Sequence, residues 1–171
     1  LEPGDYIVAA RHGQAEVDQP VTIEPGEVDQ TVFVLNAGVL KVRPLAVAGG
    51  DPVDSAAVVA AYPGGETTGY GATTLTLPAG EQKLTVSIGA GEVTETFTLK
   101  AGETLEKDVV VGVGRAVLNA AYVAGMKVDE GGLFVEILRA AKKIDGSRDV
   151  VAYGYGPDTA HDVPAGDYVL R

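Results

Sequence analysis

The residues of this chain that could take part in catalysis are few, and no group of them is complete. The sequence has two histidines, His12 and His161, each with acidic residues nearby, and it has no cysteine. A zinc site would need a His-x-x-x-His or glutamate-flanked pair, and neither histidine belongs to one. We therefore interpret both histidines as solvated polar residues of loops. The absence of cysteine excludes disulfides, thiolate metal ligands and cysteine nucleophiles.

Calcium is the metal ion that the sequence could best accommodate. Asp145, Ser147 and Asp149 alternate as oxygen ligands do at the start of a calcium loop, and Asp51 and Asp54 offer a second acidic stretch. No bidentate glutamate follows Asp149 at the required distance, and three basic residues crowd this loop. A weak calcium site and an ordinary polar hairpin loop are the two interpretations, and the sequence favours the hairpin loop.

A pair of tyrosines offers a surface for recognition. Tyr153 and Tyr155 alternate with glycine in an expected strand, so both side chains point to the same face. Exposed tyrosine pairs can stack on sugars or anchor a protein partner. They could also cover the sandwich and pack against a neighbouring repeat, and the recurrence of Tyr70 at the position of Tyr155 favours this structural role. Carbohydrate binding through these tyrosines is the alternative.

The remaining motifs indicate a protein without enzymatic activity. The sequence contains no Ser-His-Asp order, no pair of carboxylates in a catalytic context and no phosphate-binding loop. The segment 112–117, Gly-Val-Gly-Arg-Ala-Val, has two glycines but lacks the third glycine and the helix of a nucleotide-binding fingerprint. We expect no catalytic residue and no cofactor, with calcium as the one ion left open.

The charge balance restricts the kinds of partner. The net charge of -11 argues against nucleic acids and anionic membranes, since both require clustered cations. A short basic run could contact an acidic patch on another repeat, or it could form a solvated loop. No apolar run of about 18 residues is present, so we expect no membrane insertion. The basic run consists of Arg139, Lys142, Lys143 and Arg148.

The most informative feature of the chain is an internal repeat. A shift of 76 residues places 1–40 on 77–116 without a gap. A second, shorter match aligns 68–82 with 153–168, so that Tyr70 corresponds to Tyr155 and Pro78-Ala79-Gly80 to Pro164-Ala165-Gly166. Matched glycines mark backbone positions that need a positive φ or a close approach. The glycines matched in the first alignment are Gly4 with Gly80, Gly13 with Gly89, Gly26 with Gly102, and Gly38 with Gly114.

The repeat predicts the organisation of the 171-residue chain. Residues 1–37 form the C-terminal part of a β-sandwich repeat, 38–113 a complete repeat, and 114–171 the N-terminal part of a further repeat. Because the first part has late strands and the last part early ones, the two could complete each other. Such pairing could occur within one chain or between neighbouring chains.

Local patterns predict strands throughout. Most segments are short, rich in β-branched residues and bounded by glycine or proline. The segment 131–143 could be a helix, with Leu133, Ile137 and Ala141 on one stripe, but its counterpart 54–65 is too short and too closely flanked by glycine and proline. We predict strands for both. The fold class is therefore all-β, with tandem Ig-like or transthyretin-like β-sandwich repeats of antiparallel strands.

Several segments resemble known bacterial repeats. The turn Leu-Pro-Ala-Gly-Glu at 77–81, the strands at 84–103 and the segment 163–171 resemble the closing strands of carboxypeptidase-regulatory-like and transthyretin-like domains. The segments 35–42 and 135–156 are similar to repeats in bacterial proteins that also carry a von Willebrand factor A domain. This resemblance implies exported, modular, non-catalytic repeats. The middle copy departs from the pattern at Gln82, where the family turn has tyrosine.

These observations lead to a functional expectation. We expect a structural or adhesive β-sandwich module from a larger exported bacterial protein, located in the periplasm or at the cell surface. The module would act as a spacer or a platform for protein partners or neighbouring repeats. The export signal would lie outside this chain. The alternative is a carbohydrate-binding module that uses its exposed tyrosines.

Overall fold

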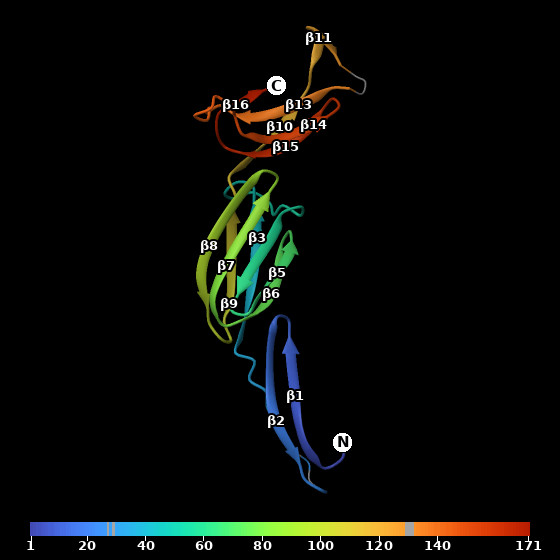
Figure 1. The fold of residues 1–171 in the computed structure, drawn as a ribbon, viewed down its shortest axis with the longest axis vertical. Coiled ribbons are helices and arrows are strands. Elements are labelled where there is room, and N and C mark those ends of the chain that lie inside the picture. Colours follow the sequence, from blue (N-terminus) through green and yellow to red (C-terminus); the bar gives the residue numbers. More distant parts are fainter. Residues whose placement is uncertain (27, 29, 129–131) are drawn as a thin grey trace.

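Strands provide all the regular structure in residues 1–26, 28, 30–128 and 132–171, the part of the chain that the computed structural model describes. They form three groups along an elongated molecule, with the N-terminal hairpin at one end, a sandwich in the middle and the C-terminal strands at the other end (Figure 1). The predicted all-β class with antiparallel sheets is confirmed.

The N-terminal group is a two-stranded hairpin. β1 (Gly4–His12) and β2 (Ala15–Ile23) pair antiparallel along their whole length. Alternate side chains of both strands point to one side, and this side is half-buried and apolar except for Gln19. Residues 28 and 30–36, which follow, belong to no strand. The apolar face contains Tyr6, Val8, Ala10, Val17, Val21 and Ile23.

The middle group is a sandwich of two sheets, with the strand orders β6-β3-β9 and β5-β4-β7-β8. Neighbouring strands pair antiparallel except β3 and β9, which run parallel. The parallel pair arises because the chain crosses from one sheet to the other between β8 and β9. The strands are β3 (Ala37–Leu45), β4 (Ala57–Tyr62), β5 (Gly65–Tyr70), β6 (Thr73–Pro78), β7 (Gly80–Ile88), β8 (Gly91–Leu99) and β9 (Thr104–Val110).

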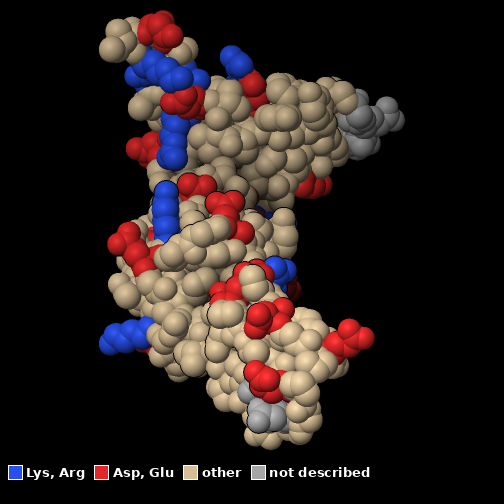
Figure 2. Space-filling model, turned by 60° about the horizontal axis from the view of Figure 1, so that its bottom comes forward, with Lys and Arg blue, Asp and Glu red and all other residues tan. Residues whose placement is uncertain are grey.

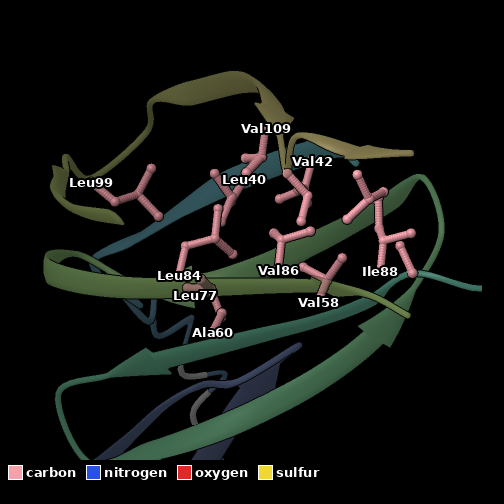
Figure 3. Close-up of a cluster of buried hydrophobic side chains, with 13 residues drawn as sticks. Leu40, Val42, Val58, Ala60, Leu77, Leu84, Val86, Ile88, Leu99 and Val109 are labelled. Carbon is pink, nitrogen blue, oxygen red and sulfur yellow. The ribbon is translucent and has the colours of Figure 1, made fainter. Parts of the chain in front are cut away.

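The core of this sandwich consists of aliphatic side chains that point into the space between its sheets (Figure 3). Leu40 and Val42 of β3 point toward Leu84 and Val86 of β7, and all four are at most 1% exposed. Alternation of buried and exposed residues along each strand supplies this layer. The buried cluster contains Leu40, Val42, Ala56, Val58, Ala60, Leu77, Leu84, Val86, Ile88, Leu99, Val109, Val111 and Val113.

The C-terminal group is smaller. β10 pairs with β15, β13 lies between β14 and β16, and the short hairpin β11-β12 projects away from them (Figure 1). Its buried hydrophobic cluster contains Leu118, Ile137 and Val163. The strands are β10 (Val113–Leu118), β11 (Ala121–Val123), β12 (Met126–Lys127), β13 (Phe134–Arg139), β14 (Val150–Tyr155), β15 (Thr159–Pro164) and β16 (Tyr168–Leu170).

The strand predicted in 131–143 is confirmed by β13, although residue 131 itself lies outside the described residues. A helix would have buried one stripe, whereas β13 pairs with strands on both edges, β14 and β16. The counterpart segment 54–65 contains β4, which likewise lies between two strands.

The N-terminal hairpin repeats part of the central sandwich in the same register. In β1 and β2, Gly4 lies opposite Ile23. In β7 and β8, Gly80 lies opposite Leu99, which is the same pair after the shift of 76 residues found in the sequence. The hairpin β1-β2 is therefore equivalent to the hairpin β7-β8.

The C-terminal group repeats the other strands. Ala37 lies opposite Pro78 in the pair β3-β6, and Val113 lies opposite Pro164 in the pair β10-β15. The sheet β14-β13-β16 has the same order as β5-β4-β7. In this structure β1 and β2 pair only with each other, at the opposite end of the molecule from the C-terminal strands (Figure 1). The two end groups therefore do not complete each other within one chain.

A hydrogen bond recurs at the turn that precedes β1, β7 and β16. Each time, a side chain donates to the backbone carbonyl oxygen of the residue four positions earlier, which closes the turn. Glutamine makes this bond in the middle copy, so it replaces tyrosine without loss of the contact. The bonds join Tyr6 to Glu2 (2.7 Å), Gln82 to Pro78 (2.9 Å) and Tyr168 to Pro164.

Candidate functional site

Three aromatic rings meet on the outer face of the sheet β14-β13-β16. The strand register places Phe134 opposite Tyr155 and Glu136 opposite Tyr153. Since side chains alternate across a strand, these residues share one face, while Ile137 points into the core. The Phe134 ring centroid lies 5.0 Å from that of Tyr155 and 6.3 Å from that of Tyr153. The tyrosine centroids are 6.5 Å apart, so the rings form one cluster.

This aromatic cluster is open to solvent. Tyr153 is 61% exposed, Tyr155 74% and Phe134 43%. Tyr70, at the position equivalent to Tyr155 in the central sandwich, is 70% exposed even though that sandwich has two full sheets. Exposure is therefore a property of this position in the unit, independent of the number of strands around it.

Tyr70 does not belong to the cluster. It lies in β5 opposite Ala57, at the place where the C-terminal group has Phe134. Thr68 occupies the position of Tyr153. The tyrosine recurs between units, but the group of three rings is particular to the C-terminal strands.

The cluster can contact a ligand through its ring faces and phenol hydroxyls. Glu136 is the carboxylate beside the rings, and its Oε2 lies 2.5 Å from a guanidinium nitrogen of Arg171. Sequence analysis identified Tyr153 and Tyr155 but missed Phe134. Phe134 stands in a run of apolar residues with Leu133 and Val135, which does not show the face to which its ring points, and its partner strand could be assigned only with the register.

The contacts between successive groups of strands also recur. At the turn of the hairpin β1-β2, the backbone amide of Gln14 donates to the carbonyl oxygen of Thr76 in β6 at 2.9 Å. At the turn of the hairpin β7-β8, the amide of Ala90 donates to the carbonyl oxygen of Asp162 in β15, also at 2.9 Å. Gln14 and Ala90 are equivalent in the repeat, and β6 is equivalent to β15. The same backbone hydrogen bond thus joins each hairpin to the next group, and at the first boundary the hydroxyl of Tyr62 also donates to the side-chain oxygen of Gln14 at 3.0 Å.

Glycine allows both of these contacts. Gly13 has a φ of 60° and Gly89 a φ of 55°, in the left-handed region that favours glycine. A Cβ on Gly13 would lie 2.7 Å from the carbonyl oxygen of Thr76, and a Cβ on Gly89 would lie 2.8 Å from the Cβ of Asp162. Any side chain would therefore push the hairpin away from its neighbour.

The histidines lie elsewhere than expected. Both were predicted in loops, but His12 ends β1 and His161 lies within β15. His12 is exposed, whereas His161 is half-buried and its Nε2 has no hydrogen-bond partner. That nitrogen lies beside Gly154 of β14, where a Cβ would come within 2.9 Å of it. The loop assignment was wrong because the strand β15 begins at Thr159, before the histidine.

The residues considered for calcium form local contacts. The Asp145 carboxylate accepts hydrogen bonds from the amide (2.9 Å) and hydroxyl (2.7 Å) of Ser147, and these bonds lower the pKa of Asp145. Asp149 forms an ion pair with Lys143 at 2.5 Å. Within the described residues, no three histidine or acidic side chains are grouped as metal ligands. This arrangement is that of a polar hairpin loop between β13 and β14.

Other members of the basic run also have partners close by. Arg139 donates to the hydroxyl of Tyr168 at 3.2 Å and lies over its ring. Arg148 donates to the carbonyl oxygen of Ala140. On the face shown in Figure 2, acidic side chains are scattered in small groups, and most basic side chains gather along one side. No helix in the described part of the chain could cross a membrane.

An acidic residue fixes the base of the projecting hairpin β11-β12. The Asp158 carboxylate accepts hydrogen bonds from the side chains of Asn119 (2.5 Å) and Lys127 (3.4 Å). In return, the amide of Asp158 donates to the side-chain oxygen of Asn119 at 2.7 Å. The bond from Asn119 lowers the pKa of Asp158 most, and the charge of Lys127 adds to this effect.

Comparison with known proteins gives a distant similarity to a solved structure. No protein-family model matches the chain, and no curated protein matches it. A solved structure titled the Bacillus anthracis TIE protein aligns at 13% identity with a TM-score of 0.38. The alignment covers 98% of this chain and 35% of that one, so the chain spans about a third of the length of the solved structure.

Proposed function

We propose that this chain is a non-catalytic structural module of a larger exported bacterial protein, in which tandem β-sandwich units form a stiff spacer with an interaction surface. The observation that carries the proposal is the hydrogen bond from hairpin turn to neighbouring strand, which recurs at both boundaries between units. In this proposal the chain contains the late part of one unit, a complete unit and the early part of the next, residues 1–37, 38–113 and 114–171.

The covalent connection between units supports stiffness. β9 ends at Val110 and β10 begins at Val113, so only two residues link them. The amide of Val111 donates to the carbonyl oxygen of Leu45 at 2.9 Å. The amide of Gly112 likewise donates to the carbonyl oxygen of Ala46 at 3.0 Å. The turn of the β7-β8 hairpin adds a second attachment to the next unit. Two attachments on different strands restrict bending more than a free linker does.

The location and partners follow from the sequence resemblance. Similarity to repeats of bacterial proteins with a von Willebrand factor A domain supports a place in the periplasm or at the cell surface. Neighbouring repeats and other proteins are the proposed partners. The net charge of -11 gives no support to nucleic acids as partners.

Small-angle X-ray scattering of the whole chain tests the spacer. We expect the profile of a single elongated particle. Replacing Gly13 and Gly89 by valine should loosen both boundaries and produce the profile of flexibly linked units. Gly114→Ala is the control, because Gly114 has no atom within 4 Å of an added Cβ and no positive φ. A flexible profile for the unaltered chain, or no change in the double variant, would refute the proposal.

Carbohydrate binding by the aromatic cluster is a second candidate, favoured by the three exposed rings on one face. A glycan array would identify sugars, and titration of tyrosine fluorescence would measure their binding. Tyr155→Ala should abolish binding, while Tyr70→Ala should not, although the two residues are 74% and 70% exposed. Absence of binding, or equal effects of the two variants, would eliminate this candidate.

A further inference from the structure

We propose that the central sandwich bears mechanical load, with the parallel strands β3 and β9 as the pair that resists tension along the molecule. The inference rests on the proposed function, because tension reaches this sandwich only if it stands between neighbours in a row of units. It concerns the one part of the chain that has two full sheets and a neighbour attached at each end.

The covalent chain enters the central sandwich at one end and leaves it at the other. It enters at Ala37, where β3 begins, and leaves at Val110, where β9 ends. β3 and β9 run parallel to each other and lie along the long axis of the molecule (Figure 1). Tension between the neighbours therefore pulls β3 toward the N-terminal hairpin and β9 toward the C-terminal group, so that the two strands slide past each other.

Sliding loads the whole hydrogen-bond ladder between β3 and β9 at once. The register runs without a shift from Val39 opposite Thr104 to Leu45 opposite Val110. The hydrogen bonds of a parallel pair are evenly spaced and link one strand to the other, so tension along the strands strains all of them together. Two strands pulled apart from the same end would instead lose their bonds one at a time.

Hydrogen bonds also close both ends of this ladder. At its beginning, the amide of Gly102 donates to the carbonyl oxygen of Ala37 at 2.8 Å. At its end, the amide of Gly112 donates to the carbonyl oxygen of Ala46 at 3.0 Å. The points where the chain enters and leaves the sandwich are thus tied across the two strands, and peeling has no loose end from which to start.

The proline in β3 does not interrupt the ladder. A proline lacks the amide hydrogen that a central strand needs for its partner. The carbonyl oxygen of Leu45 accepts from Val111, on the side of β9, whereas the carbonyl oxygen of Pro44 accepts from the amide of Val53 at 2.9 Å. Successive backbone groups of a strand point to opposite edges, so Pro44 faces the edge of β3 that is turned away from β9.

The contact between β3 and β9 is the one that tension along the molecule breaks first. β3 is held on both edges, because it lies between β6 and β9, and its side chains Leu40 and Val42 belong to the core. β9 pairs with β3 alone. The strength of the sandwich along its axis is therefore set by this one pair of strands.

Two ion pairs cross the same strands in register. Nζ of Lys41 lies 2.9 Å from Oε1 of Glu106, and a guanidinium nitrogen of Arg43 lies 3.4 Å from a carboxylate oxygen of Asp108. Exposed ion pairs contribute little to equilibrium stability. A slide by one residue would separate both pairs, because it moves the side chains of one strand to the other face. Both pairs therefore oppose sliding in particular.

Single-molecule force spectroscopy of the whole chain tests the direction of this strength. Cysteines can serve as attachment points for the handles, because the native chain has none. In the sliding geometry the handles are attached through Val34→Cys and Gly114→Cys, one beyond each end of the sandwich. Val34 is 65% exposed, and Gly114 has no atom within 4 Å of an added Cβ.

Two peeling geometries are the matched controls, and each shares one handle with the sliding geometry. Val34→Cys with Thr104→Cys pulls apart the beginnings of β3 and β9. Val47→Cys with Gly114→Cys pulls apart their ends. Thr104 and Val47 are both exposed. Urea unfolding compares the equilibrium stability of the variants, and either peeling pair is sufficient for the comparison if the other is destabilised.

We expect the sandwich to unfold at a force at least about twice as high in the sliding geometry as in the peeling geometries, because the bonds of the ladder must break together. The released length identifies the event, since each pair of handles encloses a known number of residues. Equal forces in sliding and peeling, or a lower force in sliding, would overturn the proposal. Equal forces together with a rigid, elongated scattering profile would leave the spacer role intact, so the failure of load bearing and the failure of the proposed function can be distinguished.

Discussion

Val113 occupies the space that a side chain on Gly91 would need. A Cβ added to the buried Gly91 would overlap Cγ1 of Val113 and lie 3.0 Å from a methyl group of Val111. At the preceding junction the equivalent residues are Ala15, which is fully buried, and Ala37. The larger residue of one junction is thus opposite a glycine, while the other junction has two alanines. The two positions are coupled through the volume that they share.

This coupling predicts that substitutions at the two positions compensate each other. Gly91→Ala alone should overpack the junction and destabilise the chain by about 1–3 kcal/mol. Val113→Ala alone should leave a cavity and cost about 1–2 kcal/mol. The double variant reproduces the alanine pair of the other junction. Its loss of stability should be clearly smaller than the sum of the losses in the two single variants. Urea unfolding measures all three, and additive losses would show that the positions are independent.

The turn hydrogen bonds predict that removing a tyrosine hydroxyl lowers stability more at a partly buried turn than at an exposed one. Tyr168→Phe removes a partly buried bond to the carbonyl oxygen of Pro164, together with the bond that Arg139 donates to the same hydroxyl, and should cost at least about 1 kcal/mol. Tyr6→Phe removes the equivalent bond at an exposed site, where water can replace the hydroxyl, and should cost less. Amide hydrogen exchange in the strands after each turn would measure both effects. A larger loss for Tyr6→Phe would contradict this account.

The sequence predicted those features that depend on local pattern and repetition. Alternation along β7 and β8, together with the repeat, was sufficient to predict strands and the equivalence of hairpins. The parallel pairing of β3 with β9 was not predicted, because it joins strands distant in sequence. The cluster around Phe134 depends on the register of β13 and β14, which includes a bulge between Ile137 and Leu138. At this shift two adjacent apolar residues, Ile137 and Leu138, are both buried, so the alternation expected of a strand fails there.

Two separate cores predict two unfolding transitions. Leu84 belongs to the central cluster and Ile137 to the C-terminal one, and each is 1% exposed. Leu84→Ala should cost about 2–5 kcal/mol and lower the transition of the central sandwich. Ile137→Ala should lower the transition of the C-terminal strands and leave the other nearly unchanged. Scanning calorimetry resolves the two. A single transition shifted equally by both variants would show that the groups unfold as one.

The contacts of Asp158 predict an acid-sensitive attachment of the β11-β12 hairpin. Asn119 and Lys127 lower the pKa of Asp158 in the folded chain, so the stability from this carboxylate is present above its ordinary pKa of about 3.9. That stability should be lost as the pH falls from there through the lowered folded pKa, because protonation removes the charge that Lys127 contacts. NMR shifts of the amides of Lys127 and Asp158 would follow the release. Asp158→Asn cannot titrate and should show no such change with pH, so an unaltered pH profile in this variant would assign the transition to another group.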